Sequence, residues 1–140
     1  MDGQLPHATS DEMAVKSAVE GLLAAMGTHD LDALPDMFAA EANIGIASLR
    51  DGDWTTSTMR FEQFLAELEA EIDPTPYTEP VAEFTVHVDR GRLAFVRADA
   101  TLFVDGQAVR HNFDYFTLIK EYGTWKFVNA SYVGTPAPAG

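Results

Sequence analysis

The sequence predicts an α+β fold, because helical patterns occupy its N-terminal half and strand patterns its C-terminal half. Apolar residues recur at helical spacing up to Met26, which predicts a first helix over residues 11–26. Apolar and polar residues then alternate in four segments, which predicts antiparallel strands over residues 81–88, 93–104, 108–120 and 124–133. Asp105-Gly106 and Tyr122-Gly123 have the composition of hairpin turns. Helices followed by a meander favour α+β over alternating βαβ units.

Shorter elements are expected between the first helix and these strands. Asp30 is a suitable N-cap for a second helix predicted over residues 31–40. Residues 43–49 predict a short strand, and Asp51-Gly52-Asp53 predicts a turn after it. An apolar stripe predicts a third helix over residues 60–72, and its glutamates then form a solvated face.

Composition restricts the classes of partner. Nine Lys and Arg against 22 Asp and Glu give a formal net charge of −13, so a nucleic acid or an anionic membrane surface is not expected as a partner. The chain has no cysteine, which excludes disulfides and thiolate chemistry. It also has no apolar run of the roughly 18 residues that span a bilayer, and no secretory signal. We therefore expect a cytoplasmic protein.

The 140 residues are the size of one domain. A single domain is expected over residues 11–133. The polar residues 1–10 and the Pro- and Gly-containing residues 134–140 are expected to be flexible tails.

The order of the elements and one local motif resemble the nuclear-transport-factor-2-like superfamily. The motif covers residues 113–129, where a strand containing Asp114 meets a Gly-x-Trp-(Lys/Arg)-(Ile/Val) turn. A weaker match covers residues 29–43. The most similar branches are the lumazine-binding and polyketide-cyclase-like ones. The resemblance implies a cone in which a curved mixed or antiparallel sheet wraps around three N-terminal helices and encloses a pocket. It also implies that homodimers form through the outer sheet face.

The two-residue turn Tyr122-Gly123 predicts the register of the last hairpin. The predicted pairs are Leu118 with Phe127, Phe116 with Asn129, and Asp114 with Ser131. In the superfamily, positions with the parity of the motif's Trp tend to face the pocket, so the resemblance points this face inward. The resulting candidate ligand-binding residues, together with Met26 of the first helix, are Asn112, Phe116, Leu118, Trp125, Phe127, Asn129 and Ser131.

The opposite choice of faces remains open. It would place His111, Tyr115 and Tyr132 in the pocket instead. With the preferred choice, the outward face carries aromatic residues together with Arg97 and Asp99. An aromatic patch of this size favours burial in a homodimer, with Arg97 and Asp99 pairing across the two-fold axis.

Asp114 and His29 are the candidate catalytic residues. A carboxylate that is partly buried against aromatic residues has its charged form disfavoured, and its pKa rises toward the range of a general acid or base. The alternative is a structural Asp114 that bonds Ser131. His29 follows the first helix, and in this superfamily the equivalent loop approaches the pocket; capping of the helix is the alternative. Neither a metal nor a cofactor is expected, because the histidine spacing fits no metal site and no Gly-rich phosphate loop is present.

Three functions follow from these observations. The first is a small-molecule binding domain of unspecified ligand, with a small apolar or planar metabolite in the pocket. The second is a cofactor-independent isomerase, dehydratase or cyclase that uses Asp114 as general acid or base. The third is a dimerisation module with a vestigial pocket. We rank binding first, because the sequence shows no obvious pair of converging acid and base groups.

Overall fold

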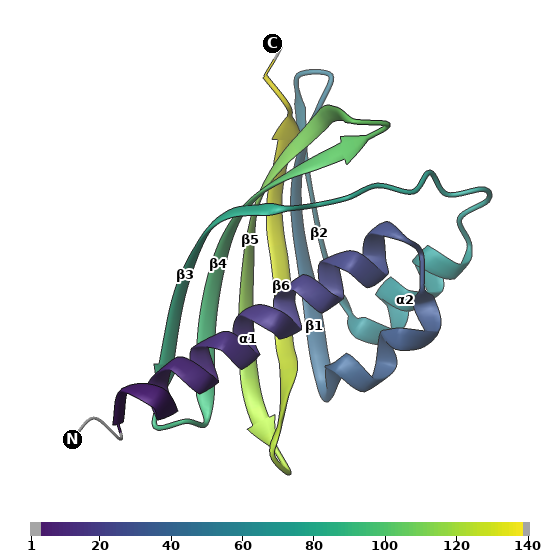
Figure 1. The fold of residues 1–140 in the computed structure, drawn as a ribbon. Helices are drawn as coiled ribbons and strands as arrows, with labels where there is room; N and C mark the ends of the chain where they lie inside the picture. The colour runs from purple at the N-terminus through teal and green to yellow at the C-terminus, as the bar shows by residue number, and fades with distance from the viewer. Residues whose placement is uncertain (1–3, 139–140) are drawn as a thin grey trace.

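The computed structural model describes residues 4–138, and it forms one six-stranded sheet with helices on one side (Figure 1). The strands are β1 (Phe38–Arg50), β2 (Asp53–Arg60), β3 (Val81–Asp89), β4 (Leu93–Val104), β5 (Gln107–Glu121) and β6 (Thr124–Pro136). Their order in the sheet is β2-β1-β6-β5-β4-β3. β1 is parallel to β6, and the other neighbours are antiparallel. The predicted α+β class and curved mixed sheet are confirmed.

Two α-helices form the second layer. The long helix α1 (Gln4–Gly27) crosses the concave face of the sheet, and α2 (Phe61–Glu69) lies beside its C-terminal end (Figure 1). Two 3₁₀ turns, Leu31–Ala33 and Pro35–Met37, connect α1 to β1. Over the described residues, no helix is both long enough and apolar enough to cross a membrane.

The predicted helix boundaries need correction. α1 begins at Gln4, so residues 4–10 are helical rather than part of a loose tail. The helix predicted over residues 31–40 is wrong, because only the two 3₁₀ turns form and β1 already begins at Phe38. Pro35 lacks the N–H that a continuing helix would need. At the other end β6 continues to Pro136, while residues 1–3 and 139–140 of the predicted tails lie outside the described part.

β2 was not predicted. Nearly all of its side chains are exposed, so its sequence has no alternation of apolar and polar residues. It is an edge strand that pairs only with β1, through the predicted turn at Asp51 and Gly52. An edge strand that packs on neither face carries no period-2 signal. The third helix is also shorter than predicted and ends at Glu69.

The core lies where the middle of α1 packs on the central strands. Val15 and Val19 of α1 are fully buried against the sheet, as are Val96 of β4 and Leu118 of β5. Stacking of Phe38 on Phe61, with ring centroids 4.3 Å apart, attaches the start of α2 to this core. The cluster therefore fixes both helices relative to the sheet.

A β-bulge interrupts the last hairpin. Leu118 pairs with Phe127 as predicted, but the next pair is Thr117 with Asn129, so Val128 is an extra residue in β6. Beyond it, Phe116 pairs with Ala130 and Asp114 with Tyr132, not with Asn129 and Ser131. An extra residue changes the face on which every later side chain of β6 lies. The bulge therefore brings Ala130, Tyr132 and Gly134 to the concave face.

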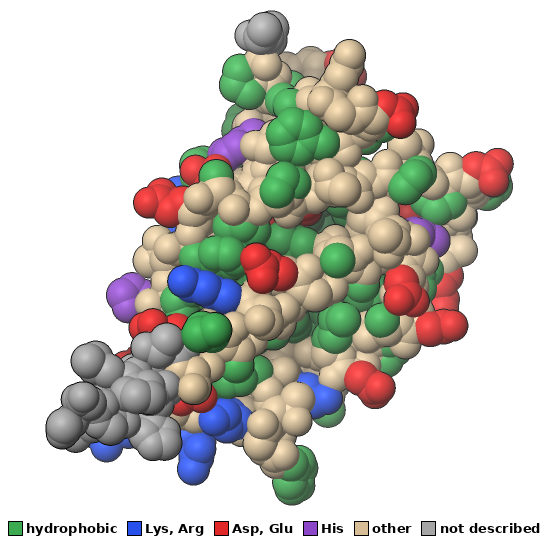
Figure 2. All heavy atoms as spheres, viewed as in Figure 1, with side chains coloured by type: hydrophobic (Ala, Val, Ile, Leu, Met, Phe, Trp, Pro, Cys, Tyr) green, Lys and Arg blue, Asp and Glu red, His purple; other side chains and the backbone are tan. Residues whose placement is uncertain are grey.

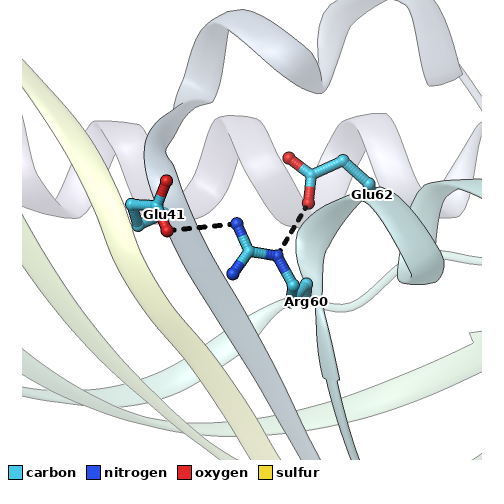
Figure 3. Close-up of polar contacts among 3 residues, drawn as sticks. All are labelled: Glu41, Arg60 and Glu62. Carbon is cyan, nitrogen blue, oxygen red and sulfur yellow. Dashed lines mark hydrogen bonds and ion pairs between the residues drawn. The ribbon is translucent and has the colours of Figure 1, made fainter.

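An exposed ion-pair cluster joins the edge of the sheet to α2 (Figure 3). Arg60, the N-cap residue of α2, lies 3.1 Å from Glu41 of β1 and 3.5 Å from Glu62 of α2. The Glu41 carboxylate raises the pKa of Arg60. Because all three side chains are largely in solvent, their attraction is screened and does not determine the fold.

Candidate functional site

A cavity of about 340 Å³ lies between the concave face of the sheet, the C-terminal half of α1, α2 and the loop over residues 70–80. Its apolar lining consists of Leu22, Leu23, Met26, Phe38, Ile44, Phe64, Leu68, Pro74, Leu102, Phe116 and Ala130. Its polar lining consists of His29, Arg50, Glu71, Thr75, Tyr77, Glu79, Asn112, Asp114, Ser131 and Tyr132. Apolar surface combined with converging polar groups is typical of small-molecule sites, and the volume suits a small ligand.

The loop over residues 70–80 forms one side of this cavity. It can pack there because α1 ends at a glycine, Gly27, which leaves space for the loop backbone. The N–H of Tyr77 donates a hydrogen bond to the carbonyl of Gly27 over 3.0 Å. A Cβ atom at position 27 would lie 2.2 Å from the carbonyl oxygen of Tyr77, so only glycine allows this contact. The loop crosses the open end of the sheet (Figure 1) and carries Tyr77 and Glu79 to the cavity.

Two carboxyl groups meet inside the cavity. Asp114 projects from β5 and is 3% exposed, and Glu79 reaches it from the loop before β3. Among the described residues, no N–H or O–H donor bonds Asp114 Oδ2 or Glu79 Oε2. The two side chains lie close enough to hydrogen-bond each other. Ionised carboxylates only accept hydrogen bonds, so this contact requires a proton on one of them.

The electrostatics place that proton on Glu79. Burial raises the pKa of Glu79 far above its ordinary value, and its hydrogen bond to ionised Asp114 raises it further. Burial also raises the pKa of Asp114, while the hydrogen bond from Glu79 and the charge of His111 oppose this rise. Near neutral pH the pair therefore holds one proton, which Glu79 donates to Asp114.

Two phenols and one amide surround the pair. Burial is the main cause that raises the pKa of Tyr132, and the same cause raises the pKa of Tyr77. Both phenols therefore stay protonated and present O–H donors at neutral pH. Asn112 precedes Asp114 by two residues on the same face of β5, and hydrogen bonding by its side chain lowers the pKa of Glu79. The cavity thus combines acid, phenol and amide groups against an apolar wall.

The structure brings most of the predicted site residues to this cavity. Met26, His29, Asn112, Asp114 and Phe116 line it; Ser131 also borders it, but the bulge places its hydroxyl on the opposite face, next to Gly45. His29 also lies 3.7 Å from Glu71 at the edge of the lining. Their roles in binding or catalysis remain predictions.

Four predicted residues do not line the cavity. Leu118, Trp125 and Phe127 are buried in the core beneath α1. Asn129 lies next to the bulge, where its amide donates to Asn43 Oδ1 over 2.6 Å. Ser131 in turn donates to Asn129 Oδ1 over 2.8 Å, so the alternative in which Ser131 bonds Asp114 is wrong.

Glu79 and Tyr132 were missed for different reasons. Glu79 lies in a Pro-containing loop, where no periodicity indicates a direction for a side chain. Tyr132 was assigned to the outer face, and the bulge reverses that assignment. No irregularity of β5 separates His111 and Tyr115 from the Tyr122-Gly123 turn, and both lie on the outer face as expected. There His111 Nε2 donates to Asp99 Oδ1 over 2.6 Å, and Arg97 donates to the Tyr115 hydroxyl over 2.9 Å.

The glutamates of α2 lie in solvent. Glu62, Glu67 and Glu69 are exposed, and Figure 2 shows acidic side chains spread over this side of the molecule. Within the described residues, no cluster of three His, Asp or Glu side chains is arranged to hold a metal ion. These acidic residues therefore form a solvated face.

This helix-covered curved sheet with an internal cavity defines a nuclear-transport-factor-2-like domain. The model of the family described as "Putative lumazine-binding" matches residues 10–133, so the chain belongs to that family. A comparison with curated proteins finds no match.

Solved structures share the fold at low sequence identity. A protein of unknown function from Silicibacter pomeroyi, described as NTF-2 like, has 20% identity and a TM-score of 0.61, over 89% of this chain and 96% of its own. A protein of unknown function from Mycobacterium tuberculosis has 16% identity and a TM-score of 0.75, over 93% of this chain and 75% of its own. The beta subunit of a "putative aromatic-ring-hydroxylating dioxygenase" from Novosphingobium aromaticivorans has 10% identity and a TM-score of 0.71, over 95% of this chain and 94% of its own. At these identities the likeness shows the fold alone.

The carboxyl pair predicts a specific dependence of stability on pH. Because the folded-state pKa values are raised, the folded protein holds a proton that the unfolded chain releases above about pH 4. The free energy of unfolding is therefore highest at acidic pH and falls as pH rises, by up to ~1.4 kcal/mol per pH unit for one proton. We expect Glu79→Gln to remove most of this slope between about pH 5 and 8.

Urea unfolding at several pH values measures the slope. Glu83→Gln is the matched control, because Glu83 is an exposed glutamate on β3 and the substitution changes the net charge equally. If the slopes of Glu79→Gln and Glu83→Gln are equal, Glu79 does not hold the proton.

Proposed function

We propose that the protein binds one small, largely apolar molecule in the cavity, with a polar group of that molecule at the Asp114–Glu79 pair. The observation that carries the proposal is the pair itself, because one shared proton leaves further lone pairs of these buried carboxyl oxygens without a donor, which is costly unless a partner supplies one. A ligand hydroxyl or N–H would satisfy them. Membership of the family described as "Putative lumazine-binding" supports the binding of a small molecule.

The size of the cavity supports a compact ligand. Phe116 and Ala130 line it from the sheet, and Phe64 and Leu68 line it from α2. A volume of about 340 Å³ is at the small end of ligand sites. A mono- to tricyclic molecule fits this description better than a cofactor of dinucleotide size.

A cavity-filling variant tests binding. Ala130→Leu adds volume inside the cavity, and we expect it to lose any molecule that copurifies with the wild-type protein. Native mass spectrometry of protein purified without added ligand measures this, with mass addition as the readout. Ala108→Leu, which adds the same volume at an exposed position of β5, should retain the adduct. An adduct that Ala130→Leu also retains would not lie in the cavity.

A second function is favoured by the same pair. Asp114 is ionised and desolvated, with a raised pKa, which makes it a better proton acceptor than an exposed carboxylate. We propose that it removes a proton from a carbon next to a substrate carbonyl and returns it at another carbon. The Tyr132 hydroxyl would donate to the developing oxyanion, while Glu79 keeps its hydrogen bond to Asp114. This is the proton transfer of a cofactor-independent isomerase, dehydratase or cyclase.

A cyclic β,γ-unsaturated ketone tests proton transfer, since its conversion to the conjugated enone is followed by ultraviolet absorbance. Asp114→Asn should lower the rate by about 10²–10⁴-fold. Asp99→Asn, at the outer face, should leave it nearly unchanged. A wild-type rate equal to that in buffer, together with an adduct in the cavity, would leave binding as the function and reject catalysis of this type.

We further propose that a second copy of the chain covers the outer sheet face. Phe95 and Tyr115 are exposed there, next to Phe113, over which the Arg97 guanidinium lies 4.1 Å from the ring centroid. Because Arg97 and Asp99 are already bonded within the chain, the apolar area rather than an ion pair would drive association.

Light scattering at several concentrations tests this assembly. Phe95→Asp should shift the mass from dimer to monomer. Ile72→Asp, which alters an exposed apolar residue away from this face, should leave the mass unchanged. A wild-type mass of one chain at all concentrations would refute the assembly, and with it the reading of the protein as a dimerisation module.

A further inference from the structure

The register of the three central strands arranges the concave face in rows. On β1, β6 and β5, one row consists of Ile46, Tyr132 and Asp114. The next row toward the open end consists of Ser48, Gly134 and Asn112. In the row beyond, Arg110 pairs with Pro136, and Arg50 follows Ser48 by two residues on the same face of β1. Two arginines therefore flank β6 at the end of the cavity.

Gly134 allows the Arg110 guanidinium to fold back over the sheet toward the cavity. Arg110 Nη2 donates to Ser48 Oγ over 2.9 Å, and Nη1 donates to the Leu49 carbonyl over 3.0 Å. A Cβ atom at position 134 would lie 3.4 Å from Arg110 Nη2 and 2.6 Å from Asn112 Oδ1. Three guanidinium N–H groups of Arg110 remain without a partner in these contacts. Its charge is thus fixed in place one row above Tyr132.

These two charges have no acidic counterpart in the described structure. Among residues whose side chains are described, no carboxylate lies within 4.0 Å of Arg50 or Arg110. Burial lowers the pKa of Arg110, and the nearby charge of Arg50 lowers it further. The chain has 22 acidic residues against nine basic ones. Acidic partners are therefore plentiful in this protein, and an excess of basic residues does not explain why two neighbouring arginines lack one. They form a positive end on an otherwise acidic protein.

We propose that the ligand is an organic acid whose carboxylate binds Arg50 at the open end of the cavity, with Arg110 supplying a second positive charge. This assignment rests on the proposed binding function. The apolar body of the ligand lies on Phe116 and Ala130, and its uncharged polar group meets the Asp114–Glu79 pair. Tyr132 lies in the same row as Asp114, lines the cavity and offers its hydroxyl to the ligand.

The spacing of the rows separates the arginines from Asp114, so one ligand can place a carboxylate at the arginines and an uncharged polar group at the Asp114–Glu79 pair. Rows on one face of a strand are about 7 Å apart, so the arginine row begins about two rows, roughly 14 Å of backbone, from Asp114. Arginine is long, and the folded-back Arg110 reduces this separation. A carboxylate at Arg50 therefore stays away from the negative charge of Asp114. Its attraction to the arginines is partly exposed to solvent and should weaken with salt.

Paired probes test the assignment: a set of mono- to tricyclic carboxylic acids, each with its primary amide of the same shape. Ligand-observed NMR with the full chain should detect acids bound more tightly than their amides. Arg50→Gln should weaken acid binding about ten- to hundredfold and leave amide binding unchanged. Arg92→Gln is the matched control, since Arg92 is an exposed arginine in the β3–β4 turn at the other end of the sheet.

The outcomes separate the two proposals. If acids and amides bind equally, and Arg50→Gln changes neither, the acid assignment is overturned while binding in the cavity stands. If no probe binds and Ala130→Leu alters no copurifying adduct, the binding function itself fails. If Arg92→Gln weakens acids as much as Arg50→Gln does, the effect is one of net charge and the assignment is also overturned.

Discussion

The placement of β6 between β1 and β5 is the constraint on which the site depends. β6 is parallel to one neighbour and antiparallel to the other, so its register fixes which side chains of three strands share a row. The bulge at Val128 divides this strand into two parts with opposite parity. Before the bulge, Trp125 and Phe127 enter the core; after it, Tyr132 enters the cavity. One extra residue thus separates a solid core from a polar chamber within a single strand.

The carboxyl pair has an energetic cost that the fold alone does not require. Burying two acids in an apolar cavity disfavours ionisation, and sharing one proton reduces the charge to a single negative one. A pair of apolar residues at these positions would pack without that penalty. Glu79 reaches Asp114 only because the loop before β3 docks against Gly27 at the end of α1. A costly arrangement that needs a specific backbone contact is better explained by a ligand than by stability.

Whether an element or a site residue could be predicted depends on whether a periodic sequence pattern covers it. The alternation in β3 to β6 and the helical spacing in α1 are properties of buried, two-sided elements, and they predicted those elements well. β2 is exposed on both faces and carries no such pattern. Asp114 was predicted at the cavity because β5 has no irregularity between the turn and that residue. Glu79 depends on a loop, and Tyr132 on a bulge; neither is encoded in the period of the neighbouring residues.

The distribution of charge is a further link between sequence and site. A net charge of −13 repels free anions from most of the surface, so an acidic ligand needs a local positive field to bind. Arg50 and Arg110 provide that field where the strands end, and the Asp114–Glu79 pair keeps one of its acids neutral deeper in the cavity. The polarity therefore changes along the face from the positive arginines, through the Asn112 amide, to the row that holds the Tyr132 phenol and the half-protonated acid pair, and then to apolar residues. Such a gradient orients an asymmetric molecule in one direction, because reversing it would place a carboxylate against Asp114 and leave the arginines without a counter-ion.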